Sequence, residues 1–371
     1  MSKAAILATT IALYVSTLTC THVTATKAGL KAKGANKMCQ ISQKLKDYTT
    51  YVKTKTAYAL TALAKAMQTR SKIQLLLTTQ HKQPTPKTGI ILALTKIKIE
   101  QAAQILRDSL PDSIRLTGAA ALVAGAIDDF GQILYGAENG GSNKACIVKD
   151  AGGTTKADAD EIGDCIASGT WKTGIPDQQN TAVPSYAAAA AAGGAHNDGN
   201  YHGGESGCKL LSSDTTDGFM DTAAATSAIT AAGGVLTIGT SALSSSPFTN
   251  AVTSPPAGSS LAKLKGLDHS KLATLGNTVF TDLADLAKLG DGEDPKIKKK
   301  TIKKSQLGLD GEDADIEIEG DDFKALGAAM YKFGQENSDN MDKWLKQLPQ
   351  TLIKQLTTTC NNTKTTVCQT P

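Results

Sequence analysis

The stretch "CQISQKLKDYTTYVKTKTAYALTALAKAMQTRSKIQLLLTTQ", residues 39–80, contains no glycine and no proline over about forty residues. Its apolar residues recur every three or four positions, with Lys, Gln and Thr between them: Ile41, Leu45, Tyr48, Val52, Ala59, Ala62, Ala66, Ile73 and Leu76. That spacing puts them on one face of a helix, with a narrow, alanine-rich middle. The sequence therefore predicts a helix over residues 37–80, which would be roughly 60 Å long at 1.5 Å per residue.

A second long helix is expected after a turn. The segment "QHKQPTPKTG", residues 80–89, carries two prolines and a glycine, which mark a break. Helical spacing then returns over residues 88–136, with an expected interruption at Pro111 and a restart capped by Asp112 or Ser113. Two such helices joined by a short turn bury their apolar faces against each other or a third partner, which favours an antiparallel hairpin.

In the rest of the chain, the residue composition and the spacing of apolar residues change twice. Residues 137–260 are rich in Gly, Ala, Ser, Thr and Asp, and their composition indicates a loop-rich head. Helical spacing returns near Leu261–Leu289, and a charged segment from Gly290 to Asp322 separates it from a returning helix over residues 323–358. We therefore predict a mainly α fold: an elongated antiparallel helical hairpin or coiled-coil bundle with a loop-rich, disulfide-pinned head.

The N-terminus indicates export. Lys3, an apolar run from about Ala4 to Val15, and the small residues ending at Ala25 have the order of a secretory signal peptide, residues 1–25. Its removal would discard Cys20 and leave six cysteines: Cys39, Cys146, Cys165, Cys208, Cys360 and Cys368. An even number in an exported chain predicts disulfides, although six cysteines allow 15 pairings and proximity favours only Cys360 with Cys368.

Candidate modification sites follow from the same context. Asn361-Asn362-Thr363 fits the N-x-T acceptor pattern with Asn361 as the acceptor. Serines near prolines are candidate O-glycosylation sites, with a plain flexible loop as the alternative: Ser244, Ser245, Ser246, Ser254 and Ser259.

No catalytic constellation emerges. The sequence lacks GxSxG, HExxH, the P-loop and a placed GxGxxG. His196, Asp198 and His202 form a cluster whose spacing is more typical of a solvated loop than of a metal site or a secreted hydrolase. Asp310 to Asp322 lacks the glycine and glutamate positions of a calcium loop. We expect no enzyme activity, no cofactor and no metal.

Charge also argues against nucleic acid as a partner. The formal net charge is only +4, and the basic run Lys296 to Lys304 is followed by the acidic run Asp310 to Asp322. Both runs are explained if they are surface segments whose opposite charges neutralise each other.

This order of parts resembles the N-terminal domain of a trypanosome variant surface glycoprotein, over residues 26–358. "AAALVAGAIDDFGQILYGAENGGSNKACI" (119–147) resembles the B-type subfamily in particular, and "TSAITAAGGVLTIGTSAL" (226–243) resembles a Gly-rich stretch found later in such domains. The resemblance covers nearly the whole chain, although its motifs are loose.

The resemblance implies a non-enzymatic, homodimeric coat glycoprotein that shields the parasite membrane, varies antigenically and meets host antibodies. It also implies a GPI anchor on a C-terminal domain, of which residues 359–371 would be the truncated start; the anchor is not encoded in this chain. A secreted form is the lesser expectation. The alternative is a related surface receptor for a host serum protein.

Overall fold

The protein is described from a computed structural model, which describes residues 28–80, 84–140, 144–151, 153–177, 180–192, 194, 200–216, 218–240, 243, 247–307 and 314–337. The predicted signal peptide and residues 338–371 lie outside this range. The chain divides into two compact units, each of which contains part of both long helices. Unit 1 comprises the described residues up to Leu45 with Leu122–Gly174 and Tyr186–Lys265, and unit 2 comprises Lys46–Ala121, Ile175–Ser185 and the described residues from Gly266 onward.

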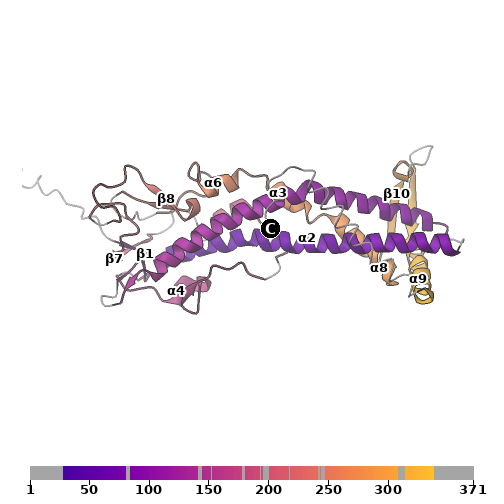
Figure 1. The fold of residues 1–371 in the computed structure, drawn as a ribbon, viewed down its shortest axis with the longest axis horizontal. Helices are drawn as coiled ribbons and strands as arrows, with labels where there is room; N and C mark the ends of the chain where they lie inside the picture. Colours follow the sequence, from indigo (N-terminus) through magenta and orange to yellow (C-terminus); the bar gives the residue numbers. More distant parts are fainter. Residues whose placement is uncertain are drawn as a thin grey trace, which may run out of the picture. The chain divides into compact units, whose positions relative to one another are not determined.

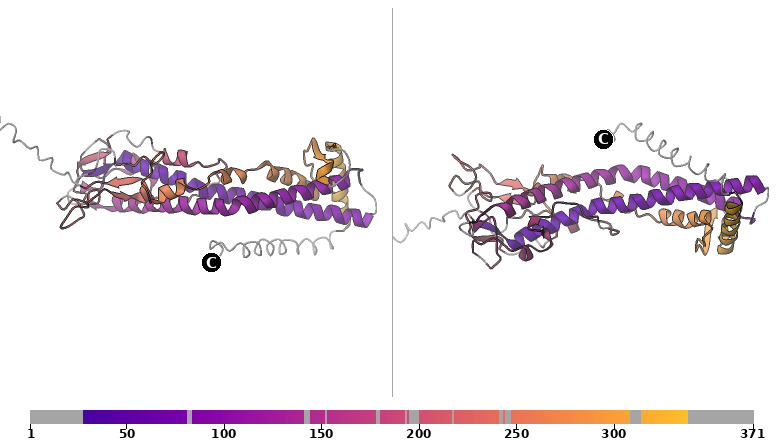
Figure 2. Two further views of the ribbon diagram at one scale, coloured as in Figure 1. Left: turned by 90° about the horizontal axis from the view of Figure 1, so that it is seen from above. Right: turned by 60° about the horizontal axis from the view of Figure 1, so that its bottom comes forward.

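Two 49-residue helices dominate the fold, α2 (Ala32–Gln80) and α3 (Thr88–Gly136). Within unit 2 they run side by side in opposite directions from the turn between them, as the views in Figures 1 and 2 agree. The first helix begins before the predicted start at residue 37. Ala32, Ala35 and Met38 are fully buried, so tertiary packing extends the helix beyond the residues whose spacing predicted it.

The expected interruption at Pro111 is wrong, since α3 continues through it. The proline cannot donate a backbone hydrogen bond to Arg107 and normally costs a helix about 3 kcal/mol. Its ring is exposed, however, while Leu106, Ser109 and Leu116 on either side are buried. Ser113 does not cap a new helix; its carbonyl oxygen accepts a hydrogen bond from Thr117 Oγ1 at 2.7 Å inside the continuous one.

Unit 1 combines the start of α2 and the end of α3 with short elements. These are β1 (Ala28–Lys31), β2 (Glu138–Asn139), β3 (Lys144–Ala145), β4 (Ile147–Val148), α4 (Ala159–Ile162), η1 (Gly163–Cys165), β5 (Ile166–Ala167), β6 (Thr170–Trp171), α5 (Tyr186–Ala190), β7 (His202–Glu205), β8 (Ile229–Ala231), η2 (Ala232–Gly234), β9 (Leu236–Ile238) and α6 (Ser260–Lys265). Strand β1 lies at the centre of a three-stranded sheet, parallel to β4 and antiparallel to β7. The apolar content of these pieces is low, as the loop-rich composition predicted.

Two disulfides fix this unit. Cys39 of α2 is bonded to Cys165, and Cys146 is bonded to Cys208, closing sequence separations of 126 and 62 residues. Bridges over separations of this size restrict the unfolded chain strongly, typically by about 2 to 4 kcal/mol each. The prediction of a mainly α fold with long helices and a loop-rich, disulfide-pinned head is confirmed.

Unit 2 adds short helices and a hairpin to the later part of α2 and the earlier part of α3. Its further elements are α7 (Ser270–Thr274), α8 (Thr278–Asp291), β10 (Lys299–Lys303), η3 (Lys304–Leu307), β11 (Asp315–Glu319) and α9 (Gly320–Glu336). The helical spacing of Leu261–Leu289 thus belongs to α6, α7 and α8 and not to one continuous helix. Asp268 Oδ1 accepts from the Ser270 backbone N–H at 2.9 Å, and Asn277 Oδ1 accepts from the Val279 N–H at 2.9 Å. Both side chains favour turns and helix starts over helix interiors.

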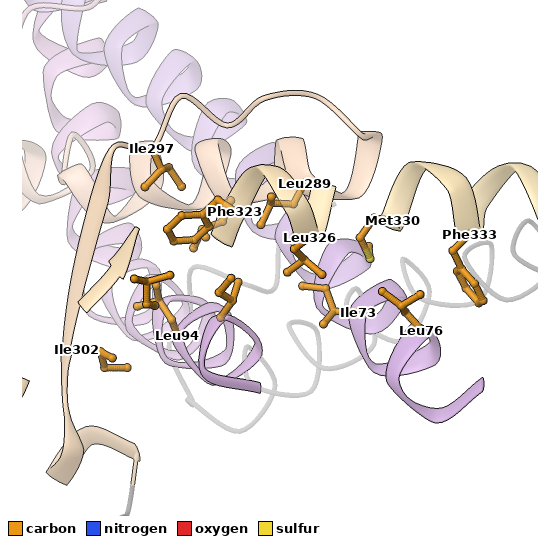
Figure 3. Packing of buried hydrophobic residues seen from close by; sticks show 13 residues of the cluster. Ile73, Leu76, Leu94, Leu289, Ile297, Ile302, Phe323, Leu326, Met330 and Phe333 are labelled. Carbon is orange, nitrogen blue, oxygen red and sulfur yellow. The ribbon is translucent and has the colours of Figure 1, made fainter. Parts of the chain in front are cut away.

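The core of unit 2 joins α2, α3, α8, the hairpin and α9. Figure 3 shows this cluster of buried side chains, with these members labelled: Ile73, Leu76, Leu94, Leu289, Ile297, Ile302, Phe323, Leu326, Met330 and Phe333. In Figures 1 and 2, α9 runs across the two long helices near the turn between them. The described part of the returning helix therefore crosses the two long helices and does not run alongside them. Its predicted continuation to residue 358 lies outside the described residues.

Candidate functional site

The charged segment before α9 is an antiparallel hairpin, which sequence reasoning missed. Lys299 pairs in register with Glu319, and Lys303 with Asp315. The outward side chains of β10 therefore face carboxylates across the strand pair, and Lys299 Nζ lies 2.6 Å from Glu317 Oε1. Ile302 and Ile318 point the other way and are buried. The alternation in "KKTIK" and "DIEIE" was the signal that could have found these strands. Lys299 and Lys300 are thus each paired with a carboxylate, which argues against an anion-binding patch on this strand.

One carboxylate ties this hairpin to the helices. Asp282 of α8 accepts hydrogen bonds from Lys300 Nζ at 2.6 Å and lies 2.8 Å from Lys98 Nζ of α3. Burial alone would raise the pKa of the Asp282 carboxyl, but the two ammonium groups outweigh burial and hold the pKa below its usual value. This arrangement stabilises the fold and involves no reactive group.

A polar cluster fixes the head end of the helices. Ser42 Oγ of α2 donates to Asp128 Oδ1 of α3 at 2.7 Å, and Trp171 Nε1 donates to the same oxygen at 3.3 Å. Trp171 packs against Gly131, where an added Cβ would lie 2.6 Å from the indole ring. The glycine is therefore required so that the ring can approach the helix backbone.

Unit 1 also contains a cavity of about 340 Å³. Lys37 and Ile41 of α2, residues 190–191 at the end of α5, Val235, and the segment 248–252 form its walls. Tyr186 Oη donates to the Ala251 carbonyl oxygen at 2.5 Å, and burial raises the pKa of Tyr186 to about 12. The phenol therefore stays protonated at neutral pH and holds one wall of the cavity in place.

Two exposed apolar features stand out on unit 1. On α3, Leu122 and Ile133 are 64% and 54% exposed, and Gly125 between them has open space where a Cβ would be. In the head, Phe219 and Met220 are adjacent in the chain and 45% and 38% exposed. Contiguous exposed apolar side chains mark candidate interaction surfaces.

Among the described residues, α3 is also the helix long and apolar enough to cross a membrane by length and composition, and 33% of its most apolar window is buried. Helices from the cores of folded domains pass the same test, so composition alone does not assign α3 to a membrane.

The predicted site residues fall in different places. His202 lies in β7, opposite Leu30 of β1, while His196 and Asp198 lie outside the described residues. Within the described part of the chain, no group of three or more His, Cys, Asp or Glu side chains could hold a metal ion.

The candidate modification sites are also only partly described. Ser254 is exposed. Ser259 is half-buried, and its Oγ accepts from the Ala262 backbone N–H at 3.1 Å, which makes it a poorer glycan acceptor. Ser244, Ser245, Ser246, Cys360, Asn361 and Cys368 lie outside the described residues.

The described parts thus form a helical, disulfide-pinned scaffold with exposed apolar side chains and a small cavity. Comparison with known proteins is consistent with a helical scaffold protein that carries disulfides. The family model of the trypanosome variant surface glycoprotein (A-type) matches residues 11–366. The chain belongs to the trypanosome variant surface glycoprotein family.

One similar relative is the variant surface glycoprotein ILTAT 1.3 of Trypanosoma brucei brucei, which is 34% identical over 154 residues. That match covers 39% of this chain and 30% of the relative, so it spans less than a third of the relative's length. A solved structure described as that of MITat 1.1 is 15% identical and covers 86% of this chain and 99% of that chain, with a TM-score of 0.47.

The B-type assignment is not confirmed, because the family model that matches describes the A-type. The stretch 119–147 that suggested it consists of the Ala/Gly-rich end of α3, where close helix packing alone favours small residues, and the short strands that follow. Such composition carries little information about subfamily.

Proposed function

We propose that this chain is an exported, non-enzymatic coat glycoprotein that shields the parasite surface and is exchanged in antigenic variation. The match of the family model over residues 11–366 is the observation that carries the proposal. The fold supports it physically: long paired helices provide a scaffold, and the loops of the head tolerate substitution because they contribute little core. No step of this role requires a catalytic residue.

Export and glycosylation of the chain can be tested together. We expect the chain expressed in trypanosomes to lose residues 1–25 and to carry an N-glycan at Asn361. N-terminal sequencing should therefore begin near Thr26, and glycosidase treatment should lower the mass. Asn361→Gln should abolish that mass change, and Asn250→Gln, whose asparagine is not followed by the acceptor pattern, should not. An unchanged mass of the unsubstituted chain after glycosidase treatment would reject Asn361 as the glycan site.

We infer further that a second copy of the chain covers the exposed face of α3. Leu122 and Ile133 lie eleven residues apart on a helix, which places them on the same side, and Gly125 between them permits close approach. Two copies of the exposed Leu122 and Ile133 side chains can bury each other without a further partner.

A charge on this face tests the dimer. Leu122→Glu should convert a dimer into a monomer in light scattering after size exclusion, because a buried unpaired carboxylate is costly. Val183→Glu, at a side chain that is 50% exposed outside α3, is the matched control and should leave the dimer intact. A dimer that withstands Leu122→Glu would place the interface elsewhere.

The second candidate function is a surface receptor for a host serum protein. The exposed pair Phe219 and Met220 in the head favours it, since aromatic and methionine side chains are enriched in protein interfaces. A receptor should retain one serum component at micromolar concentration, and Phe219→Ser should release it. Absence of any retained serum protein would remove this alternative and leave the coat role.

A further inference from the structure

The cavity in unit 1 has walls made mostly of apolar side chains. Its volume of about 340 Å³ falls at the lower end of the range for ligand pockets, about 300 to 1,000 Å³, so it fits a small molecule better than a peptide. These apolar residues of the walls are each at most 6% exposed: Ile41, Ala190, Val235, Phe248 and Ala251. An occupant would therefore contact mainly carbon atoms.

The polar side chains in the walls are hydrogen-bonded within the protein. Thr249 Oγ1 donates to the Gly234 carbonyl oxygen at 2.6 Å, and Lys37 Nζ donates to the Gly194 carbonyl oxygen. The side-chain oxygen of Asn250 accepts a hydrogen bond at 3.3 Å from the backbone N–H three residues later. Since these groups already have partners, a ligand would be held chiefly by the burial of its apolar surface.

The walls are held independently of any occupant. The Phe248 ring packs edge-on against the Tyr201 ring, with 4.8 Å between the ring centres, and the Tyr186 hydroxyl holds the backbone at Ala251. Ligand binding at this site would therefore cost little ordering of the protein. Ala191 in the wall is exposed, so a small molecule can enter from solvent on that side.

We propose that this cavity binds a small neutral molecule with a short apolar body, which lies against Phe248, Val235 and Val252. The recognition depends on the apolar surface that the ligand buries and not on a charge. Such a site is separate from the coat role, which requires no ligand, so the two proposals stand or fall independently.

The test uses the purified, disulfide-bonded full chain and two neutral probes that differ only in chain length, 1-butanol and 1-hexanol. Isothermal titration calorimetry and ligand-observed NMR measure their binding. Each further CH₂ group that is buried in an apolar site strengthens binding by about fourfold, so hexanol should bind about fifteenfold more tightly than butanol. An alcohol that only touches the exposed surface would gain much less.

Variants of the walls locate the site. Ala190→Phe places a ring in the cavity and should weaken hexanol by at least about tenfold. Ala187→Phe is the matched control: Ala187 belongs to the same helix, α5, but is exposed and does not line the cavity. This variant should bind both probes as the unsubstituted chain does.

Val252→Asn keeps the test decisive if Ala190→Phe fails to fold. Val252 is a half-buried wall residue, and its replacement by a polar amide should weaken hexanol by at least about threefold. The proposal is overturned if hexanol does not bind or binds no more tightly than butanol. It is also overturned if Ala190→Phe or Val252→Asn, shown to be folded by circular dichroism, binds hexanol as the unsubstituted chain does.

Discussion

At the scale of single residues, Asp282 illustrates how charge stabilises this fold. Its carboxylate lies between Lys98 and Lys300 and links α8, α3 and β10. Asp282→Asn would leave two ammonium groups facing each other and is expected to lower the free energy of unfolding by about 1 to 2 kcal/mol at pH 7.

The same substitution predicts a pH dependence. Because the pKa of Asp282 is lower in the folded chain, its contribution is fully present above the unfolded pKa of about 3.9 and is lost as the pH falls through the folded pKa. Urea unfolding of both chains should therefore show a difference at pH 7 that shrinks below about pH 4. A difference independent of pH would mean that packing, not charge, is responsible.

A second residue-scale prediction concerns glycine in α3. Gly131→Ala places a methyl group against Trp171, at 2.6 Å from the ring, and should destabilise the chain by about 1 to 3 kcal/mol. Gly118→Ala is the contrast, since nothing lies within 4 Å of its added Cβ, and it should stabilise the helix by up to about 1 kcal/mol. Thermal unfolding followed by circular dichroism measures both, and equal effects would contradict the packing of Trp171.

At the scale of elements, the hairpin β10–β11 depends on its inward isoleucines, Ile302, Ile316 and Ile318. Ile318→Ala removes a fully buried side chain from the core of unit 2 and should cost about 2 to 5 kcal/mol. Thr301→Ala, on the exposed face of the partner strand, should change stability by less than about 0.5 kcal/mol. Native-state hydrogen exchange should show faster exchange of the β10 and β11 amides in the first variant only; protected amides there would contradict the hairpin.

The disulfide pairing is a further prediction at this scale. Peptide mass mapping without reduction should recover Cys39 linked to Cys165 and Cys146 linked to Cys208. A peptide linking Cys39 to Cys146 would contradict the packing of the head.

The elements also show what sequence could and could not predict. Long runs of helical spacing predicted α2 and α3, because one face of each helix is buried along much of its length. The predicted interruption at Pro111 was wrong because the burial of residues on both sides of the proline outweighs the loss of one backbone hydrogen bond. The hairpin was missed because its alternation is short and its charges suggested a solvated segment. The cavity could not be predicted at all, since it is formed by Lys37, Val235 and Phe248, which are far apart in the chain.

At the scale of the whole molecule, we propose that this chain is a surface coat component. The family match supports that role. A coat component must be exported and must be present on the surface in many copies. A receptor with the same fold would be needed in far fewer copies, so abundance and distribution on the cell separate the two roles.

The most direct measurement is immunofluorescence on intact, unpermeabilised trypanosomes that express this chain, with antibodies raised against its folded form. The account predicts dense, continuous staining of the whole surface, which disappears from cells that have switched to another coat. Sparse staining, or staining that requires permeabilised cells, would contradict the coat function.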